Sequence, residues 1–140
     1  MRPRVLVVMP SQRRLGLLPI LEQSGMDVYV AGYFRDAQQK LSEAAPFDLL
    51  FVDAELPDGS WQHLVQSVVE SGRNCEVIVC SRCGDEQLWA EVLQCGAYDL
   101  IPEPYDEREV ARIARSAIDS HYLRRFGRAA NSPAAMLKAS

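Results

Sequence analysis

Short apolar runs alternate along the chain with longer stretches in which apolar residues recur every three or four positions. Each run is bounded by turn-forming or polar residues, which is typical of strands buried on both faces of a parallel sheet. Five such strands are predicted: Val5–Met9, Asp27–Ala31, Phe47–Asp53, Val77–Cys80 and Tyr98–Ile101.

Amphipathic spacing after each run predicts five helices. They are expected within 12–23, from Phe34 to before Pro46, after Ser60, after Asp85 and after Asp106. The side chains of Ser60, Asp85 and Asp106 can accept hydrogen bonds from the first turn, so these residues are predicted N-caps. Gly16 and Pro19 interrupt the first stretch, so that helix either begins late, with Pro19 in its first turn, or is kinked.

Five strand–helix alternations with short connections predict a three-layer α/β/α fold around a five-stranded parallel sheet. The flavodoxin-like strand order 2-1-3-4-5 is the expected one at this size. The predicted domain covers residues 1–123. Residues 124–140 change character and are expected to form a tail, or a linker toward a possible further domain.

Composition narrows the class of protein. The chain has 140 residues, 48% of them hydrophobic, and a formal net charge of −4, which argues against nucleic acid as a direct partner. No apolar stretch approaches the ~20 residues needed to span a bilayer, and no signal-peptide pattern opens the chain. The four cysteines are therefore expected to be reduced thiols in a cytoplasmic protein.

The candidate site lies where strands end. In the predicted order, the carboxyl ends of strands one, three, four and five meet at one edge of the sheet. The residues at that edge are Met9-Pro10, Asp53, Ser81-Arg82 and Glu103. A buried strand therefore presents the carboxylate of Asp53 among the ends of its neighbours.

From Arg4 to Tyr122 the chain resembles the receiver domains of bacterial two-component response regulators. The motifs that carry the resemblance are Asp53 with Leu56-Pro57 and Gly59, Ser81, Gly96-Ala97, and Glu103-Pro104-Tyr105. The resemblance implies that Asp53 stands at the phosphoacceptor position and Ser81 at a position that contacts the phosphoryl group. It also implies a cis peptide bond between Glu103 and Pro104.

The chain departs from the family pattern at five positions. The acidic pair that helps to hold Mg²⁺ aligns with Met9 and Pro10, and the lysine that contacts the phosphoryl group aligns with Glu103. The aromatic residue that moves on activation aligns with Leu100, and a usually small residue aligns with Arg82. A thioether and a proline are poor ligands for a hard ion, so no metal or other cofactor is expected beyond weak Mg²⁺ binding at Asp53.

The substitution by Glu103 raises an electrostatic problem. Two carboxylates ~4 Å apart repel by about 4 kcal/mol at an effective dielectric constant of 20. Either one carboxyl group is partly protonated or a cation lies between them. We hypothesise that Arg82 bridges Asp53 and Glu103; the alternative is that Arg82 is a solvated loop residue.

The cysteines offer a second kind of chemistry. Cys80 and Cys83 form a C-x-x-C pattern, which marks redox or zinc sites in other proteins. Cys80 is expected inside a strand. Zinc needs four ligands, but Cys75 and Cys95 lie near opposite ends of their elements, and His63 and His121 show no pairing spacing. We therefore favour small buried apolar residues as the interpretation of all four.

The last two helices carry the candidate interaction residues. Trp89 either lies outward, where it could anchor a partner, or packs in the core with Leu88 and Val92. Arg108, Arg112 and Arg115 line one side of the last helix as a partner-binding or a solvated face.

The predicted function is that of a receiver in two-component or phosphorelay signalling that acts mainly by protein–protein interaction and is not an enzyme. Expected partners are a sensor kinase or phosphotransfer protein and an output domain or target, with a homodimer through the fourth and fifth helices left open. One alternative is an ordinary receiver phosphorylated on Asp53 with Mg²⁺. Another is a flavodoxin-like ligand-binding or redox module, against which stands the lack of a glycine-rich phosphate loop.

Overall fold

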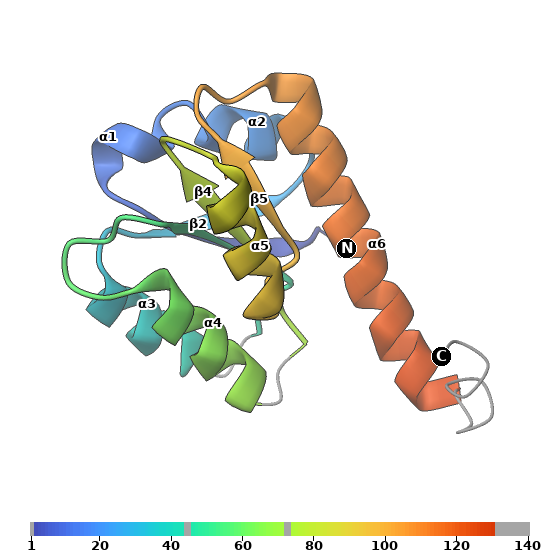
Figure 1. Ribbon diagram of the computed structural model, residues 1–140. Helices are drawn as coiled ribbons and strands as arrows, with labels where there is room; N and C mark the ends of the chain where they lie inside the picture. The colour runs from blue at the N-terminus through green and yellow to red at the C-terminus, as the bar shows by residue number, and fades with distance from the viewer. Residues whose placement is uncertain (1, 44–45, 72–73, 131–140) are drawn as a thin grey trace.

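The computed structural model describes residues 2–43, 46–71 and 74–130, with side chains up to Leu123. Within these ranges the chain alternates strands and helices as predicted (Figure 1). The elements are β1 (Arg4–Val8), α1 (Ser11–Arg14), α2 (Leu18–Gln23), β2 (Asp27–Ala31), α3 (Phe34–Leu41), β3 (Leu49–Asp53), α4 (Trp61–Glu70), β4 (Glu76–Ser81), α5 (Glu86–Gln94), β5 (Asp99–Pro102) and α6 (Glu107–Ala130).

The strands form one parallel sheet in the order β2-β1-β3-β4-β5, which confirms the predicted topology. All residues of β3 and β4 are buried, as expected for central strands covered on both faces. In the register between them, Asp53 pairs with Cys80. The last residue of β3 therefore lies next to the end of β4, where the candidate site was predicted.

Helices cover both faces of the sheet (Figure 1). One apolar core joins alternate strand residues such as Leu50 and Val79 to α3, α4 and α5. The other joins the intervening residues, such as Phe51 and Ile78, to α2 and α6. This alternation follows from the period of two along a strand and gives the predicted three layers.

The predicted helix starts are observed, but the number of helices differs. Ser60 Oγ accepts from the N–H of His63 at 3.1 Å, and Asp85 Oδ1 accepts from Leu88 at 2.7 Å. Asp106 Oδ1 accepts from Arg108 at 2.9 Å. The described residues form six helices rather than five, because the first predicted helix is divided into α1 and α2.

The division of the first helix has a local cause. Pro19 lies in the first turn of α2, where a proline needs no N–H donor. The late start was therefore the correct alternative, and the residues before it form the separate turn α1 rather than a continuous helix.

Helix α6 continues past Tyr122, where the sequence pattern changes, and extends beyond the sheet to Ala130 (Figure 1). Its last buried side chain within the described residues is His121. The tail or linker predicted for 124–140 is helical up to Ala130, and its remaining part lies outside the described residues. In the part of the chain that the structure describes, no helix is both long enough and apolar enough to cross a bilayer.

Candidate functional site

Asp53 ends β3 with its side chain completely buried. Its Oδ1 accepts a hydrogen bond of 2.9 Å from the backbone N–H of Glu55, in the loop that follows the strand. Burial raises the pKa of Asp53 above its ordinary value, although this hydrogen bond and the cation nearby act in the opposite direction. The carboxylate is thus fixed by its own loop but costly to keep ionised.

The cation beside Asp53 is Arg13. Its Nε lies 3.3 Å from Asp53 Oδ2 and 3.2 Å from Glu103 Oε1, and its Nη1 lies 3.5 Å from Glu55 Oε1. Only 8% of the Arg13 side chain is exposed. Burial acts to lower the pKa of Arg13, but the attraction of Asp53 and Glu103 outweighs it and raises that pKa. One guanidinium therefore pairs with three converging carboxylates and offsets only part of their negative charge.

The hypothesis that Arg82 bridges the carboxylates is wrong. Arg82 is exposed in the loop after β4, and in the described ranges both Asp53 and Glu103 pair with Arg13 instead. The expectation that a cation lies between Asp53 and Glu103 is nevertheless confirmed. This cation comes from α1, just after Met9-Pro10, and Arg13 itself had not been predicted as a site residue.

Helix α1 delivers Arg13 to the site. The turn follows Pro10, and Arg14 Nη1 donates a hydrogen bond of 2.9 Å to the carbonyl of Met9. A side chain at Gly16 would bring its Cβ to 3.4 Å from Tyr105, so the segment after α1 packs closely on the residue that follows Pro104. The signal for this arrangement in the sequence was the interruption of the first helix by Gly16 and Pro19.

Ser81 is buried at the end of β4, as predicted, but its hydroxyl is engaged within its own loop. Ser81 Oγ donates to the carbonyl of Cys83 at 3.1 Å and accepts from the N–H of Cys83 at 3.2 Å. Leu100 in β5 is buried in the core beneath α5. The peptide bond between Glu103 and Pro104 is cis, which confirms that prediction.

A family model of the response regulator receiver domain matches residues 11–115. This chain belongs to that family. Its fold and the position of Asp53 at the end of the central strand agree with a receiver of two-component signalling.

Relatives of known name support the assignment. The receiver is 29% identical to the chemotaxis protein CheY of Thermotoga maritima over 112 residues, which are 79% of this chain and 92% of CheY. It is 32% identical to the phosphate regulon transcriptional regulatory protein PhoB of Escherichia coli over 67% of this chain. It spans only 42% of PhoB and 26% of the response regulator PilR of Pseudomonas aeruginosa.

Solved structures agree on the fold. A CheY-like receiver domain from Methanospirillum hungatei superposes with a TM-score of 0.77 at 22% identity, covering 87% of this chain and 98% of that one. At this level of identity the likeness establishes the fold of the receiver and nothing about its chemistry.

The residues of this receiver do not fit the Mg²⁺ ion that the family resemblance implies. Met9 is completely buried, and its sulfur lies 3.9 Å from the hydroxyl of Tyr105. Neither a thioether nor Pro10 supplies the oxygen ligand that Mg²⁺ requires. The guanidinium of Arg13 lies against the carboxylate that would have to bind the ion.

The cysteines differ from one another in exposure. Cys80 is buried, and burial raises the pKa of its thiol to about 12, so it behaves as the small apolar residue we expected. The same expectation is wrong for Cys83 and Cys95, which are exposed, while Cys75 is half-buried. No group of three or more Cys, His, Asp or Glu side chains among the described residues is arranged to hold a metal ion.

Helix α5 presents an exposed apolar side. Trp89 is 49% exposed and Leu93 38% exposed, so Trp89 lies outward and the core alternative is wrong. The indole Nε1 of Trp89 donates to Asp99 Oδ1 at 3.3 Å, which fixes the ring over β5. On α6, Arg108, Arg112 and Arg115 are exposed, and Arg112 pairs with Glu109.

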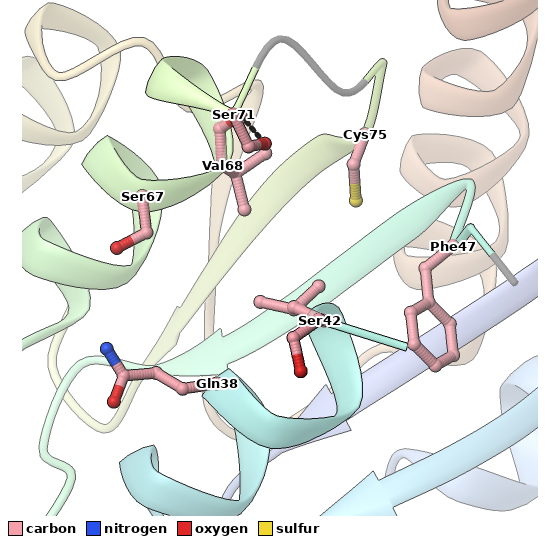
Figure 2. A pocket seen from close by; sticks show the side chains of 8 residues that line it. Gln38, Ser42, Phe47, Ser67, Val68, Ser71 and Cys75 are labelled. Atoms are coloured by element: carbon pink, nitrogen blue, oxygen red, sulfur yellow. Dashed lines mark hydrogen bonds between the residues drawn. The ribbon is translucent and has the colours of Figure 1, made fainter. Parts of the chain in front are cut away.

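A separate hollow lies between α3 and α4, away from Asp53 (Figure 2). Its volume is about 290 Å³, and Phe47, Val68 and Leu41 give it a largely apolar lining. None of the eight residues that line it in the described part of the chain carries a charge. Its polar lining residues are uncharged (Gln38, Ser42, Ser67 and Ser71), so the hollow offers no charge that would identify a cofactor.

Proposed function

We propose that this receiver signals mainly by binding other proteins, with Asp53 at the phosphoacceptor position but without efficient phosphorylation. The observation that carries the proposal is the buried guanidinium of Arg13, 3.3 Å from Asp53 and 3.2 Å from Glu103. It stands where an ordinary receiver needs a metal ion beside the aspartate and a lysine beside the phosphoryl group.

The chemistry of phosphoryl transfer supports this reading. The reaction relies almost entirely on positioning and on cations that neutralise the developing negative charge. In this site the charge of Arg13 is already shared among Asp53, Glu55 and Glu103, and Glu103 adds negative charge where the lysine would stand. A phosphoryl group on Asp53 would therefore meet repulsion from Glu103 with little compensation.

The proposed role needs neither catalysis nor a cofactor, so we propose that the receiver is not an enzyme. Its proposed partners are a sensor kinase or phosphotransfer protein, and an output domain or target protein. A cytoplasmic location stays a prediction from composition. The ordinary phosphorylated receiver remains the alternative function, and its supporting observation is the retention of Asp53 and Ser81 at the strand ends.

The outward side of α5 is the proposed contact surface. Trp89 and Leu93 are one helical turn apart and both exposed, and an exposed tryptophan is the kind of side chain that anchors interfaces. A homodimer through α5 and α6, the fourth and fifth predicted helices, would bury them. Sedimentation equilibrium of the wild type and the Trp89→Ala variant tests this: loss of self-association in the variant supports the dimer, and a wild-type monomer at all concentrations excludes it.

Phosphorylation of the intact protein is the decisive test. The wild type and the Asp53→Asn variant are incubated with acetyl phosphate and Mg²⁺, and intact masses are measured. We expect no stoichiometric adduct in either protein. A stoichiometric adduct in the wild type that is absent from Asp53→Asn would replace the proposal by the ordinary phosphorylated receiver.

A further inference from the structure

The site at Asp53 contains more buried charge than its hydrogen bonds satisfy. Within the described residues, Asp53 Oδ2 and the Nε, Nη1 and Nη2 atoms of Arg13 are buried without a hydrogen bond of acceptable geometry. Their contacts, 3.2 to 3.5 Å long, are ion pairs. The guanidinium is thus held by charge and by the packing of its turn, rather than by directed hydrogen bonds.

The three acids around Arg13 come from different parts of the fold. Asp53 ends β3, Glu55 lies in the loop after it, and Glu103 follows β5. Asp53 is completely buried, whereas Glu103 is 30% exposed and Glu55 57% exposed. The three carboxylates therefore converge on Arg13, one from the buried end of β3 and two from more exposed positions.

We infer that Arg13 is the resident cation of this site and that its guanidinium is what keeps divalent metal ions out. Carboxylate oxygens are the ligand type that hard divalent ions prefer, although with Arg13 among them the three acids do not form a group arranged to hold a metal ion. A divalent ion near Asp53 would have to lie within a few ångströms of a buried positive charge, and like charges ~4 Å apart repel by about 4 kcal/mol per unit charge at a dielectric constant of 20.

The inference explains how the substitutions around Asp53 are compatible with one another. Without the acidic pair at Met9 and Pro10, a divalent ion would lack ligands on the side of β1. Arg13, on the turn after Pro10, supplies positive charge from that same side. Glu103 then acts as a second partner for Arg13, in a place where a lysine would repel the guanidinium.

The test measures binding of Mn²⁺ by its electron paramagnetic resonance signal, which is lost when the ion is bound. The proteins are the wild type, Arg13→Gln, Arg13→Lys and Arg13→Gln/Asp53→Asn, each checked for folding by circular dichroism. We expect Arg13→Gln to bind Mn²⁺ at least about tenfold more tightly than the wild type, a difference of about 1.4 kcal/mol. Arg13→Lys should resemble the wild type, and the double variant should lose the gain.

Two results would overturn the inference: wild-type binding as tight as that of Arg13→Gln, or a folded Arg13→Gln that binds no more tightly than the wild type. Should Arg13→Gln fail to fold, the wild type alone still decides through its NMR spectrum. Specific broadening of the amide signals of Asp53 and Glu55 by Mn²⁺ would show that Arg13 does not exclude the ion, and unchanged signals support the exclusion.

The inference rests on the proposed function, but different experiments would contradict the two. A phosphorylated wild type would contradict the proposed function whatever the metal titration shows. Failure of Arg13→Gln to gain Mn²⁺ binding, with no phosphorylation, would remove the role of Arg13 in metal exclusion and leave the interaction role in place.

Discussion

An aspartate flanks β3 at each end, and the two differ in how their charge is compensated. At the amino end, Asp48 Oδ2 accepts a 2.8 Å hydrogen bond from the backbone N–H of Arg4, and Oδ1 lies 3.0 Å from Nε2 of the buried His121. At the carboxyl end, Asp53 shares one guanidinium with two other acids. The amino end pairs one carboxylate with one backbone donor and one histidine contact, whereas the carboxyl end leaves negative charge in excess.

The amino end of β3 is also held by contacts with its surroundings. The guanidinium of Arg4 stacks between Tyr29 and Phe47, 4.7 Å from each ring centre, and fixes the amino end with ordinary packing. His121 joins α6 to that end, so this pair holds the last helix on the sheet. The comparison teaches that the aspartate at one end of β3 contacts a covering helix, whereas the aspartate at the other end lies in the candidate site.

The largest expected effect is at the carboxyl end. Replacing Arg13 by Gln leaves Asp53 and Glu103 close together without their cation, and breaking a buried pair in this way should cost about 3 kcal/mol of unfolding free energy. Urea unfolding at neutral pH measures the loss. Arg14→Gln is the matched control, because it removes a hydrogen bond to Met9 from the same turn but no contact with the acids, and should cost about 1 kcal/mol. Equal costs would show that the turn matters and the charge does not.

The amino end should respond less strongly. His121→Leu removes the contact with Asp48, which keeps its hydrogen bond from Arg4 and is partly exposed, so a loss of about 1–2 kcal/mol is expected. Hydrogen exchange should become faster in the second half of α6 and stay unchanged around Asp53. Leu123→Ala, on the same helix and 72% exposed, is the control and should change neither quantity. Unchanged exchange in His121→Leu would mean that this pair does not hold the helix.

The pH dependence of stability separates Asp53 from an exposed aspartate. Burial raises the pKa of Asp53, so the folded state binds its proton more tightly than the unfolded state. Wild-type stability should therefore fall as pH rises from about 4 through the raised pKa, and Asp53→Asn should remove this loss. Asp53→Asn is therefore expected to be more stable than the wild type at neutral pH, as measured by urea unfolding at a series of pH values.

The contribution of Asp58 to stability should depend on pH in the opposite direction, which urea unfolding at a series of pH values measures. Desolvation acts to raise its pKa, but hydrogen bonds from the N–H groups of Phe34 and Arg35 lower it below the ordinary value. Its contribution to stability is therefore present above the unfolded pKa and is lost as pH falls. Asp58→Asn should reduce stability at neutral pH, and the same sign for both variants would contradict this distinction.

The smallest effect is expected for Arg82→Gln. Arg82 is exposed and, in the described part of the chain, pairs with neither Asp53 nor Glu103, so the unfolding free energy should change by less than about 0.5 kcal/mol. Chemical denaturation compares it directly with Arg13→Gln. A loss for Arg82→Gln as large as that for Arg13→Gln would assign the wrong arginine to the site.

Most of the fold could be predicted because its signals are local. The apolar runs of β1 and β3, the caps at Ser60 and Asp85, and the start of α2 at Pro19 each depend on a few neighbouring residues. The outward position of Trp89 could not be predicted, since its spacing with Leu88 and Val92 is compatible with either side of a helix. Exposure of Cys83 and Cys95 depends in the same way on how their loops and helices pack.

The site was only partly predictable. Asp53, Glu103 and the need for a cation between them follow from strand order and Coulomb's law, whereas the choice of Arg13 over Arg82 depends on the path of the turn after Pro10. That path depends on the late start of α2 and on the contact between Gly16 and Tyr105, which join positions far apart in the sequence.

A double-mutant cycle between Arg13 and Asp53 tests the central claim most directly. Unfolding free energies are measured for the wild type, Arg13→Gln, Asp53→Asn and the double variant. If Arg13 is the cation that neutralises Asp53, the second substitution should recover part of the cost of the first, with a coupling of at least about 1 kcal/mol. Effects of the two substitutions that add to within about 0.3 kcal/mol, whatever their signs, would show that the two charges do not depend on each other.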